Sequence, residues 1–140
     1  MRLGVTTAAL VASMLPALGA AQTLPGNQVS DPTYAGAIFA EACARSAPSF
    51  RQAGTTLAAN GFVMAPTGTY YHPQFDLSIR PTDSVACSIV FQVRGDAGEA
   101  VIAAGREIER RVAALDGTVD VGAYPGPGGK TYVRMSIESQ

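Results

Sequence analysis

The sequence has few of the residues that build reactive centres. It contains one histidine, His72, and two cysteines, Cys43 and Cys87, among 140 residues. A single histidine excludes a histidine-rich metal site, and two cysteines that pair with each other leave none for a zinc cluster. We therefore expect neither a metal nor another cofactor.

Charge and catalytic motifs are also sparse. The formal net charge is −1, which gives no sign of a nucleic-acid or anionic-membrane partner. There is no Gly-x-Ser-x-Gly elbow and no Asp-x-Asp-x-Asp calcium spacing. The run 128–131 reads Gly-Gly-Lys-Thr, but Tyr124 stands where a phosphate-binding loop needs glycine. We therefore expect no nucleotide site here.

Beyond the N-terminus, no stretch is apolar enough to span a membrane. Arg2 precedes an uncharged, mostly apolar run at 3–15, and small residues follow at 17–21. This pattern predicts a signal peptide at 1–21, with a mature start at Gln22, and the run is shorter than the ~20 residues of a membrane span. The mature chain would have 119 residues and a net charge of −2. We expect a soluble periplasmic or secreted protein with a flexible lead at 22–30 and a single domain at 31–140.

Two cysteines in an exported chain predict one disulfide, Cys43–Cys87. The separation of 44 residues corresponds to about 4 kcal/mol of stabilisation in the chain-entropy model. The alternative, a redox or nucleophilic thiol, would need a Cys-x-x-Cys pair or a nearby base. The sequence offers neither.

Capping residues and apolar spacing predict three helices. The first begins at Asp31-Pro32 and places Cys43 at the edge of its apolar stripe. The second begins at residue 46 or 47 and ends at 60–61. The third begins at Asp96, ends at 116–117, and carries Glu107 and Arg111 as a pair on its outer face.

Strand patterns fall at 62–65, 69–72, 75–80, 84–93, 118–121 and 131–138, with a long Gly/Pro-rich hairpin loop at 124–130. The best hairpin joins 75–80 to 84–93. This order predicts an α+β two-layer domain with a mainly antiparallel sheet of about four to five strands and helices packed on one face. The strand order cannot be deduced from these patterns.

Two short segments are candidates for a binding surface. Adjacent strand residues point to opposite faces, so either Tyr70 or Tyr71 should be exposed beside His72. The 124–130 loop carries the only lysine between two tyrosines. The predicted surface is Tyr70, Tyr71, His72, Tyr124, Lys130 and Tyr132. Ordinary strand propensity and a plain hairpin connection explain the same segments without binding.

Three functional hypotheses remain open. The first is a non-catalytic binding module of the bacterial cell envelope, whose partner is an envelope protein or another extracytoplasmic component. The second is a small envelope hydrolase with His72 as general base, Asp76 to orient it, and Ser78 or Ser88 as nucleophile. The third is a structural or stress-related periplasmic protein without a discrete ligand. The sequence leaves the oligomeric state open.

Overall fold

The structure, a computed structural model, describes residues 26–140. The predicted signal peptide at 1–21 and the mature start at Gln22 lie outside the described residues. No helix of the described part has the length and apolar character needed to cross a membrane.

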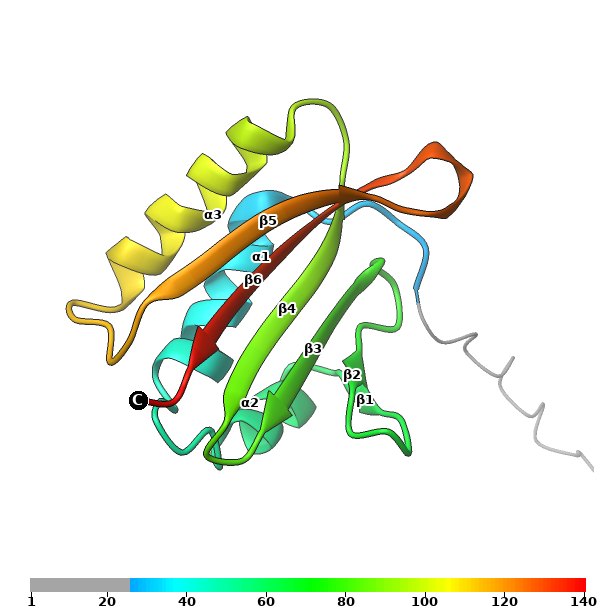
Figure 1. Ribbon diagram of the computed structural model, residues 1–140. Helices are drawn as coiled ribbons and strands as arrows, with labels where there is room; N and C mark the ends of the chain where they lie inside the picture. The colour runs from blue at the N-terminus through cyan, green and yellow to red at the C-terminus, as the bar shows by residue number, and fades with distance from the viewer. Residues whose placement is uncertain (1–25) are drawn as a thin grey trace, which may run out of the picture.

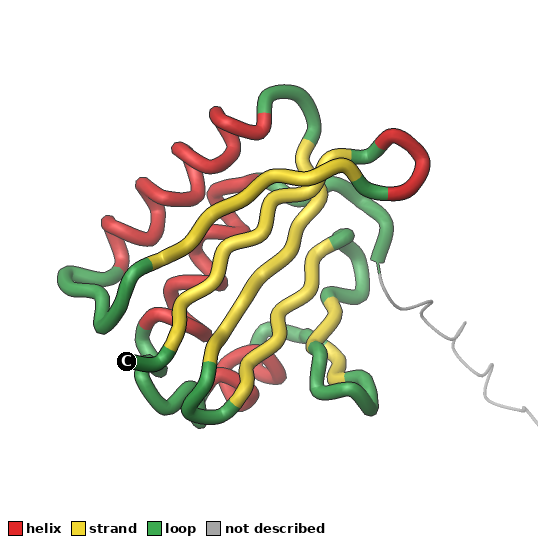
Figure 2. The backbone as a smooth tube through the Cα atoms, in the orientation of Figure 1, coloured by secondary structure: helices red, strands yellow, loops and turns green. Residues whose placement is uncertain are grey.

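One antiparallel sheet forms the centre of the fold, with the strand order β1-β2-β3-β4-β6-β5 (Figure 1). Its strands are β1 (Val63–Met64), β2 (Tyr70–Tyr71), β3 (Leu77–Thr82), β4 (Ala86–Val93), β5 (Val119–Pro125) and β6 (Thr131–Glu138). The helical elements are α1 (Pro32–Phe39), η1 (Ala40–Ala44), α2 (Ala53–Ala59), α3 (Ala97–Arg111) and η2 (Pro127–Gly129). Figure 2 shows α1, α2 and α3 on the same side of the sheet. The predicted α+β architecture, with helices on one face, is confirmed.

The sheet has six strands rather than the four to five expected. The difference arises from the two shortest strands, because β2 pairs with both β1 and β3. Two-residue strands are stable here only because they extend a larger sheet. Their addition places Val63 and Tyr71 in the same cross-strand row as Ser78.

Alternation along the strands builds the core. In β4, the second strand of the best predicted hairpin, the buried residues are Cys87, Ile89, Phe91 and Val93. They pack against the helices. The intervening residues of β4 point to the opposite face, as the two-residue period requires. The β3–β4 hairpin is confirmed, with Leu77 opposite Phe91.

The Cys43–Cys87 disulfide is confirmed. Cys43 lies in η1, a π-helical turn that continues α1, and Cys87 lies in β4. Their Cα atoms are 5.4 Å apart, and both side chains are fully buried. The bond therefore ties the helical layer to the middle of the sheet.

The helices α1 and α3 cross at a small residue. A Cβ atom on Gly36 would lie 2.4 Å from the carbonyl oxygen of Ala104. Asp31 caps α1 by accepting from the Thr33 N–H at 2.8 Å, and Asp96 caps α3 by accepting from the Gly98 N–H at 2.7 Å. Both predicted helix starts are thus confirmed, and Gly36 sets how closely the two helices approach.

Two predicted helix boundaries are wrong. The second helix begins at Ala53 rather than at residue 46 or 47, because Phe50 has a left-handed φ of 58° and interrupts helical geometry. The third helix ends at Arg111 rather than at 116–117, because Val112 is extended. The apolar stripe continued past this end and misplaced the boundary.

The predicted position of Glu107 on the outer face is also wrong. Glu107 is buried, and its carboxylate accepts from Arg110 at 2.7 Å and from Arg111 at 2.6 Å. Arg111 also contacts Glu41 at 3.3 Å, and Arg45 donates to the Arg111 carbonyl oxygen at 3.1 Å. The last turn of α3 therefore lies over η1, where Glu107 joins an ion-pair network rather than facing solvent.

Candidate functional site

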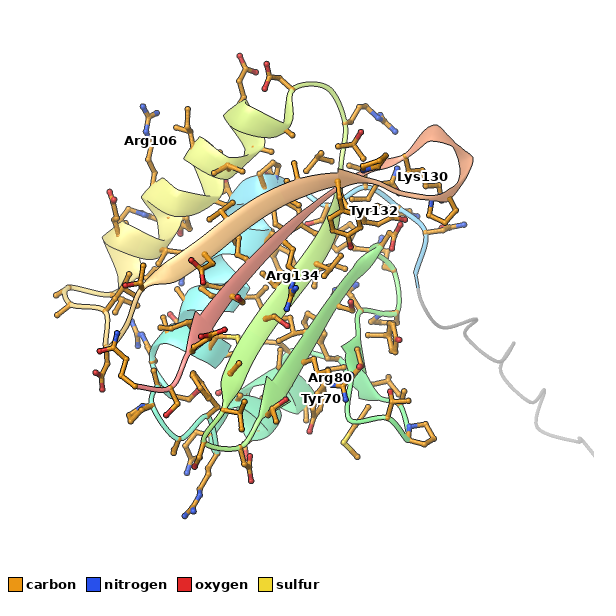
Figure 3. The ribbon with its side chains drawn as sticks, in the orientation of Figure 1. Tyr70, Arg80, Arg106, Lys130, Tyr132 and Arg134 are labelled. Atoms are coloured by element: carbon orange, nitrogen blue, oxygen red, sulfur yellow. A yellow bond between two sulfur atoms is a disulfide. The ribbon has the colours of Figure 1, made fainter. Side chains whose placement is uncertain are left out.

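The sheet face opposite the helices is not covered by any helix of the described chain (Figure 1). The registers of the central strands place nine side chains on this open face: Tyr71, Ser78, Arg80, Ser88, Val90, Gln92, Tyr132, Arg134 and Ser136. Figure 3 shows Tyr132 and Arg134 on it, facing the viewer. These side chains are therefore available for contacts outside the core.

A tyrosine pair marks one end of the open face. Tyr124 and Tyr132 are directly opposite each other in β5 and β6, and their rings stack at 5.8 Å between centroids. The Tyr132 hydroxyl donates to an Asp76 carboxylate oxygen at 2.6 Å. This hydrogen bond, with smaller contributions from burial and the nearby charge, raises the pKa of Tyr132 to about 12. The ring of Tyr132 is therefore fixed between two neighbours.

The predicted 124–130 loop is shorter than expected. Tyr124 and Pro125 belong to β5, so the connection is only Gly126 and the turn η2 before Lys130. The Gly126 N–H donates to the Lys130 carbonyl oxygen at 2.7 Å, and Gly128 and Gly129 adopt positive φ angles of 69° and 72°. Glycine makes this tight turn possible, so Lys130 sits on a defined hairpin.

Two cationic residues line one hollow near the tyrosine pair. The β4–β6 ladder ends at the pair Val93–Thr131, and Arg94 and Lys130 are the next residues on each strand. Both are exposed, both line the same hollow, and neither forms a salt bridge within residues 26–140. Like charges on neighbouring strands repel, and these two cations lie one residue beyond the last pair of the ladder. An anion bound between them would remove this repulsion.

The hollow next to this cation pair has a volume of about 740 Å³. Its other wall is the segment 27–32, together with Gln92 of β4. The Gln92 Oε1 atom is buried and has no hydrogen-bond partner among the described residues. A buried amide oxygen without a donor is costly, so a ligand that brings an N–H or O–H group would be favoured here.

The segment 26–30, expected as part of a flexible lead, is held against the sheet. The Gly26 N–H donates to the His72 carbonyl oxygen and the Gln28 N–H to the Gln74 carbonyl oxygen, both at 3.1 Å. The Asp76 N–H donates back to the Gln28 carbonyl oxygen at 2.7 Å. This segment therefore forms a fixed wall of the hollow.

Tyr70 and Tyr71 point to opposite faces, as predicted. Tyr70 packs against the core and reaches Gly54, where an added Cβ would lie 2.5 Å from the Tyr70 hydroxyl oxygen. Tyr71 is opposite Ser78 on the open face. Figure 3 places Tyr70 and Lys130 at different ends of the sheet, so the six predicted surface residues do not form one patch.

His72 points into an aromatic cluster. Its ring stacks on Phe75 at 4.6 Å and meets Phe62 and Tyr34 edge-on. Its Nδ1 atom accepts from the N–H groups of Gln74 and Phe75 at 3.1 and 3.0 Å. Burial lowers the pKa of His72. These contacts describe a neutral histidine that caps a turn.

The residues named for a hydrolase are not assembled around His72. Asp76 binds the Tyr132 hydroxyl instead of the imidazole. Ser78 and Ser88 are on the open face, whereas the His72 ring packs with Phe62 of the core. None of the hydrogen bonds among residues 26–140 joins His72 to a serine or an acid. In the same range, no three His, Cys, Asp or Glu side chains are placed to hold a metal ion.

Arg94 and Gln92 were missed by sequence reasoning. They become partners of Lys130 and Tyr132 only because β4 pairs with β6, the strand two places later in the chain. The alternation of Gln92 with the buried Phe91 and Val93 indicated that Gln92 faces away from the core. The sequence did not indicate that β4 pairs with β6, which places Gln92 opposite Tyr132.

Comparison with protein-family models, with curated proteins and with solved structures finds no match for this chain.

Proposed function

We propose that this protein is an exported, non-catalytic binding module of the cell envelope. Its ligand carries an anionic group that binds between Arg94 and Lys130. The observation that carries the proposal is that these two cations line one hollow and form no salt bridge among residues 26–140. The one acidic side chain in the lining of this hollow, Asp31, accepts from the Thr33 N–H as the cap of α1. A partner protein with an acidic segment, or an acidic envelope component, has this chemistry.

The neighbouring groups fit a ligand that also donates hydrogen bonds. Gln92 lines the same hollow as the cation pair, and its buried Oε1 atom is an acceptor without a donor among the described residues. The fixed ring of Tyr132 and the half-exposed ring of Tyr124 add flat apolar area next to it. Aromatic and arginine side chains are the usual energetic centres of protein-binding surfaces.

The Cys43–Cys87 disulfide fits the exported location. Structural disulfides form and persist in oxidising compartments such as the periplasm. The two cysteines are fully buried, which suits a structural bond rather than a reactive one. Export then explains why the ligand should be an extracytoplasmic component.

The experiment is affinity capture with charge-matched variants. The mature protein is immobilised and exposed to a cell-envelope extract, and bound components are identified by mass spectrometry. Arg94→Gln/Lys130→Gln removes the cation pair. Arg51→Gln/Arg106→Gln removes the same charge from two exposed positions away from it, Arg51 near α2 and Arg106 on α3 (Figure 3).

We expect the wild type and the control variant to retain the same component, and the cation-pair variant to bind it at least about tenfold more weakly. Charge-assisted hydrogen bonds contribute about 1.5–3 kcal/mol each, and 1.4 kcal/mol is tenfold in affinity. Equal retention by the two double variants would refute the placement. Loss of the captured component with Tyr71→Ala alone would place the binding site at the β2 end of the sheet instead.

A further inference from the structure

The strand β5 forms one edge of the sheet and is poorly protected against pairing. Six of its seven residues, 120–125, are exposed, and Asp120 is the only charged residue in the strand. Natural edge strands are usually blocked by lysine, by proline within the strand, or by a covering element. Here the only proline is Pro125, at the end of the strand.

The hairpin hydrogen bond identifies which backbone groups of β5 are free. Gly126 and Lys130 form a hydrogen-bonded pair, and such pairs alternate along an antiparallel ladder. Residues 120, 122 and 124 therefore bond to β6. The N–H and C=O groups of Val119, Val121 and Ala123 point away from the sheet.

From this edge we propose that two copies of the chain form a two-fold dimer through antiparallel pairing of β5 with β5. In the register that places Val121 opposite Val121 of the second copy, Val119 pairs with Ala123. This register uses all three outward-pointing residues and leaves Pro125 outside the ladder. It joins the β5 edges of the two copies into one continuous sheet. This dimer does not require the ligand proposed above.

The charges on the open face complement each other in this register. Gly122 is opposite Arg134 in the same chain, and Asp120 of the second copy would be opposite Gly122. Arg134 and that Asp120 are then two strands apart, about 10 Å between Cα atoms, with no side chain between them. Both are exposed and without a salt bridge in the described range.

The helix side of β5 supplies apolar contact. A hollow of about 160 Å³ lies between α3 and β5, lined by Val101, Ile108, Leu115, Val119 and Val121 among others. Val121 is 46% exposed and Leu115 is 38% exposed. Pairing of the two β5 strands would bring the two Val121 side chains together and cover this hollow.

The first test is the oligomeric state, measured by sedimentation velocity over a range of protein concentrations. We expect a dimer for the wild type and a monomer for Val121→Lys, which places two ammonium groups at the axis. Val85→Lys is the matched control, because Val85 is also exposed but lies at the β3–β4 turn. A monomeric wild type at all concentrations would overturn the proposal.

The second test fixes the register. Asp120→Arg should raise the dissociation constant of the dimer by opposing Arg134, and Asp120→Arg/Arg134→Asp should restore it. The Val121→Cys variant should form a disulfide between the two copies at this position. Hydrogen-bonded strand pairs have Cα atoms about 5.5 Å apart, which is within the range for a disulfide. Val85→Cys should not form such a disulfide. Cross-linking at Val85 equal to that at Val121, or no rescue by the charge exchange, would contradict this register.

Discussion

Breaking the Cys43–Cys87 bond is the perturbation whose size the structure defines best. The bond closes a separation of 44 residues and joins η1 to the central strand β4. The chain-entropy model gives about 4 kcal/mol for a loop of this length. The free energy of unfolding of a whole domain is about 5–15 kcal/mol, so the bond accounts for a large share of it.

The assay is equilibrium unfolding in urea of residues 22–140, oxidised and reduced. Reduction retains both sulfur atoms, so the difference reports mainly the cross-link, together with the greater separation that two thiols need. Cys43→Ala/Cys87→Ala also leaves a cavity at two fully buried positions. We expect reduction to lower the free energy of unfolding by about 4 kcal/mol. The double variant should lose more than this.

The slope of the urea transition gives a second readout. A reduced chain has a more expanded denatured state, so its unfolding exposes more surface and its m-value should rise. Oxidised and reduced proteins that differ by less than about 1 kcal/mol, with equal m-values, would refute the loop-closure reasoning. In that case the fold would be held mainly by packing of the helices on the sheet.

Three further predictions concern packing and pH. Gly36→Ala should destabilise the protein by about 1–3 kcal/mol, measured by urea unfolding, because the new methyl group meets the Ala104 carbonyl oxygen; Gly105→Ala, where an added Cβ meets nothing, is the control. Hydrogen bonds from the two neighbouring arginines hold the pKa of Glu107 low. The ionised Glu107 therefore stabilises the folded protein fully above the pKa of the unfolded state, about 4.3, and this stabilisation is lost as pH falls through the folded pKa. Glu107→Gln should flatten this acid part of the curve of unfolding free energy against pH. Burial lowers the pKa of His72, so stability should fall as pH drops below about 6.5 towards the folded pKa, and His72→Asn, which keeps an acceptor, should abolish that slope. Unfolding curves for Glu107→Gln or His72→Asn with an unchanged pH dependence would contradict the corresponding assignment.

The sequence predicted the layers of this fold better than its connections. Capping by Asp31 and Asp96 and the alternation around Cys87 are local signals, and all three were correct. The disulfide followed from the number of cysteines and the predicted export. The predicted start of the second helix and the predicted end of the third were wrong. At Phe50 and Val112 the backbone conformation depends on long-range contacts rather than on local sequence.

The candidate site was predicted in part. Tyr124, Lys130 and Tyr132 share one hairpin, so their proximity was visible in the sequence. Arg94 belongs to the same site only through the pairing of β4 with β6, which no local pattern encodes. His72 was considered as a general base because it is the only histidine. In the structure its Nδ1 atom accepts from the Gln74 N–H and caps a turn.

The proposed function requires the Arg94–Lys130 pair to bind an anionic group. The most direct measurement is a chemical-shift titration of ¹⁵N-labelled residues 22–140 with glutarate, a simple dicarboxylate, repeated for Arg94→Gln/Lys130→Gln. We expect saturable shifts of the amide signals of Gln92, Gly95 and the segment 27–31, all absent in the double variant. Shifts that never saturate, or that persist unchanged in the variant, would contradict it.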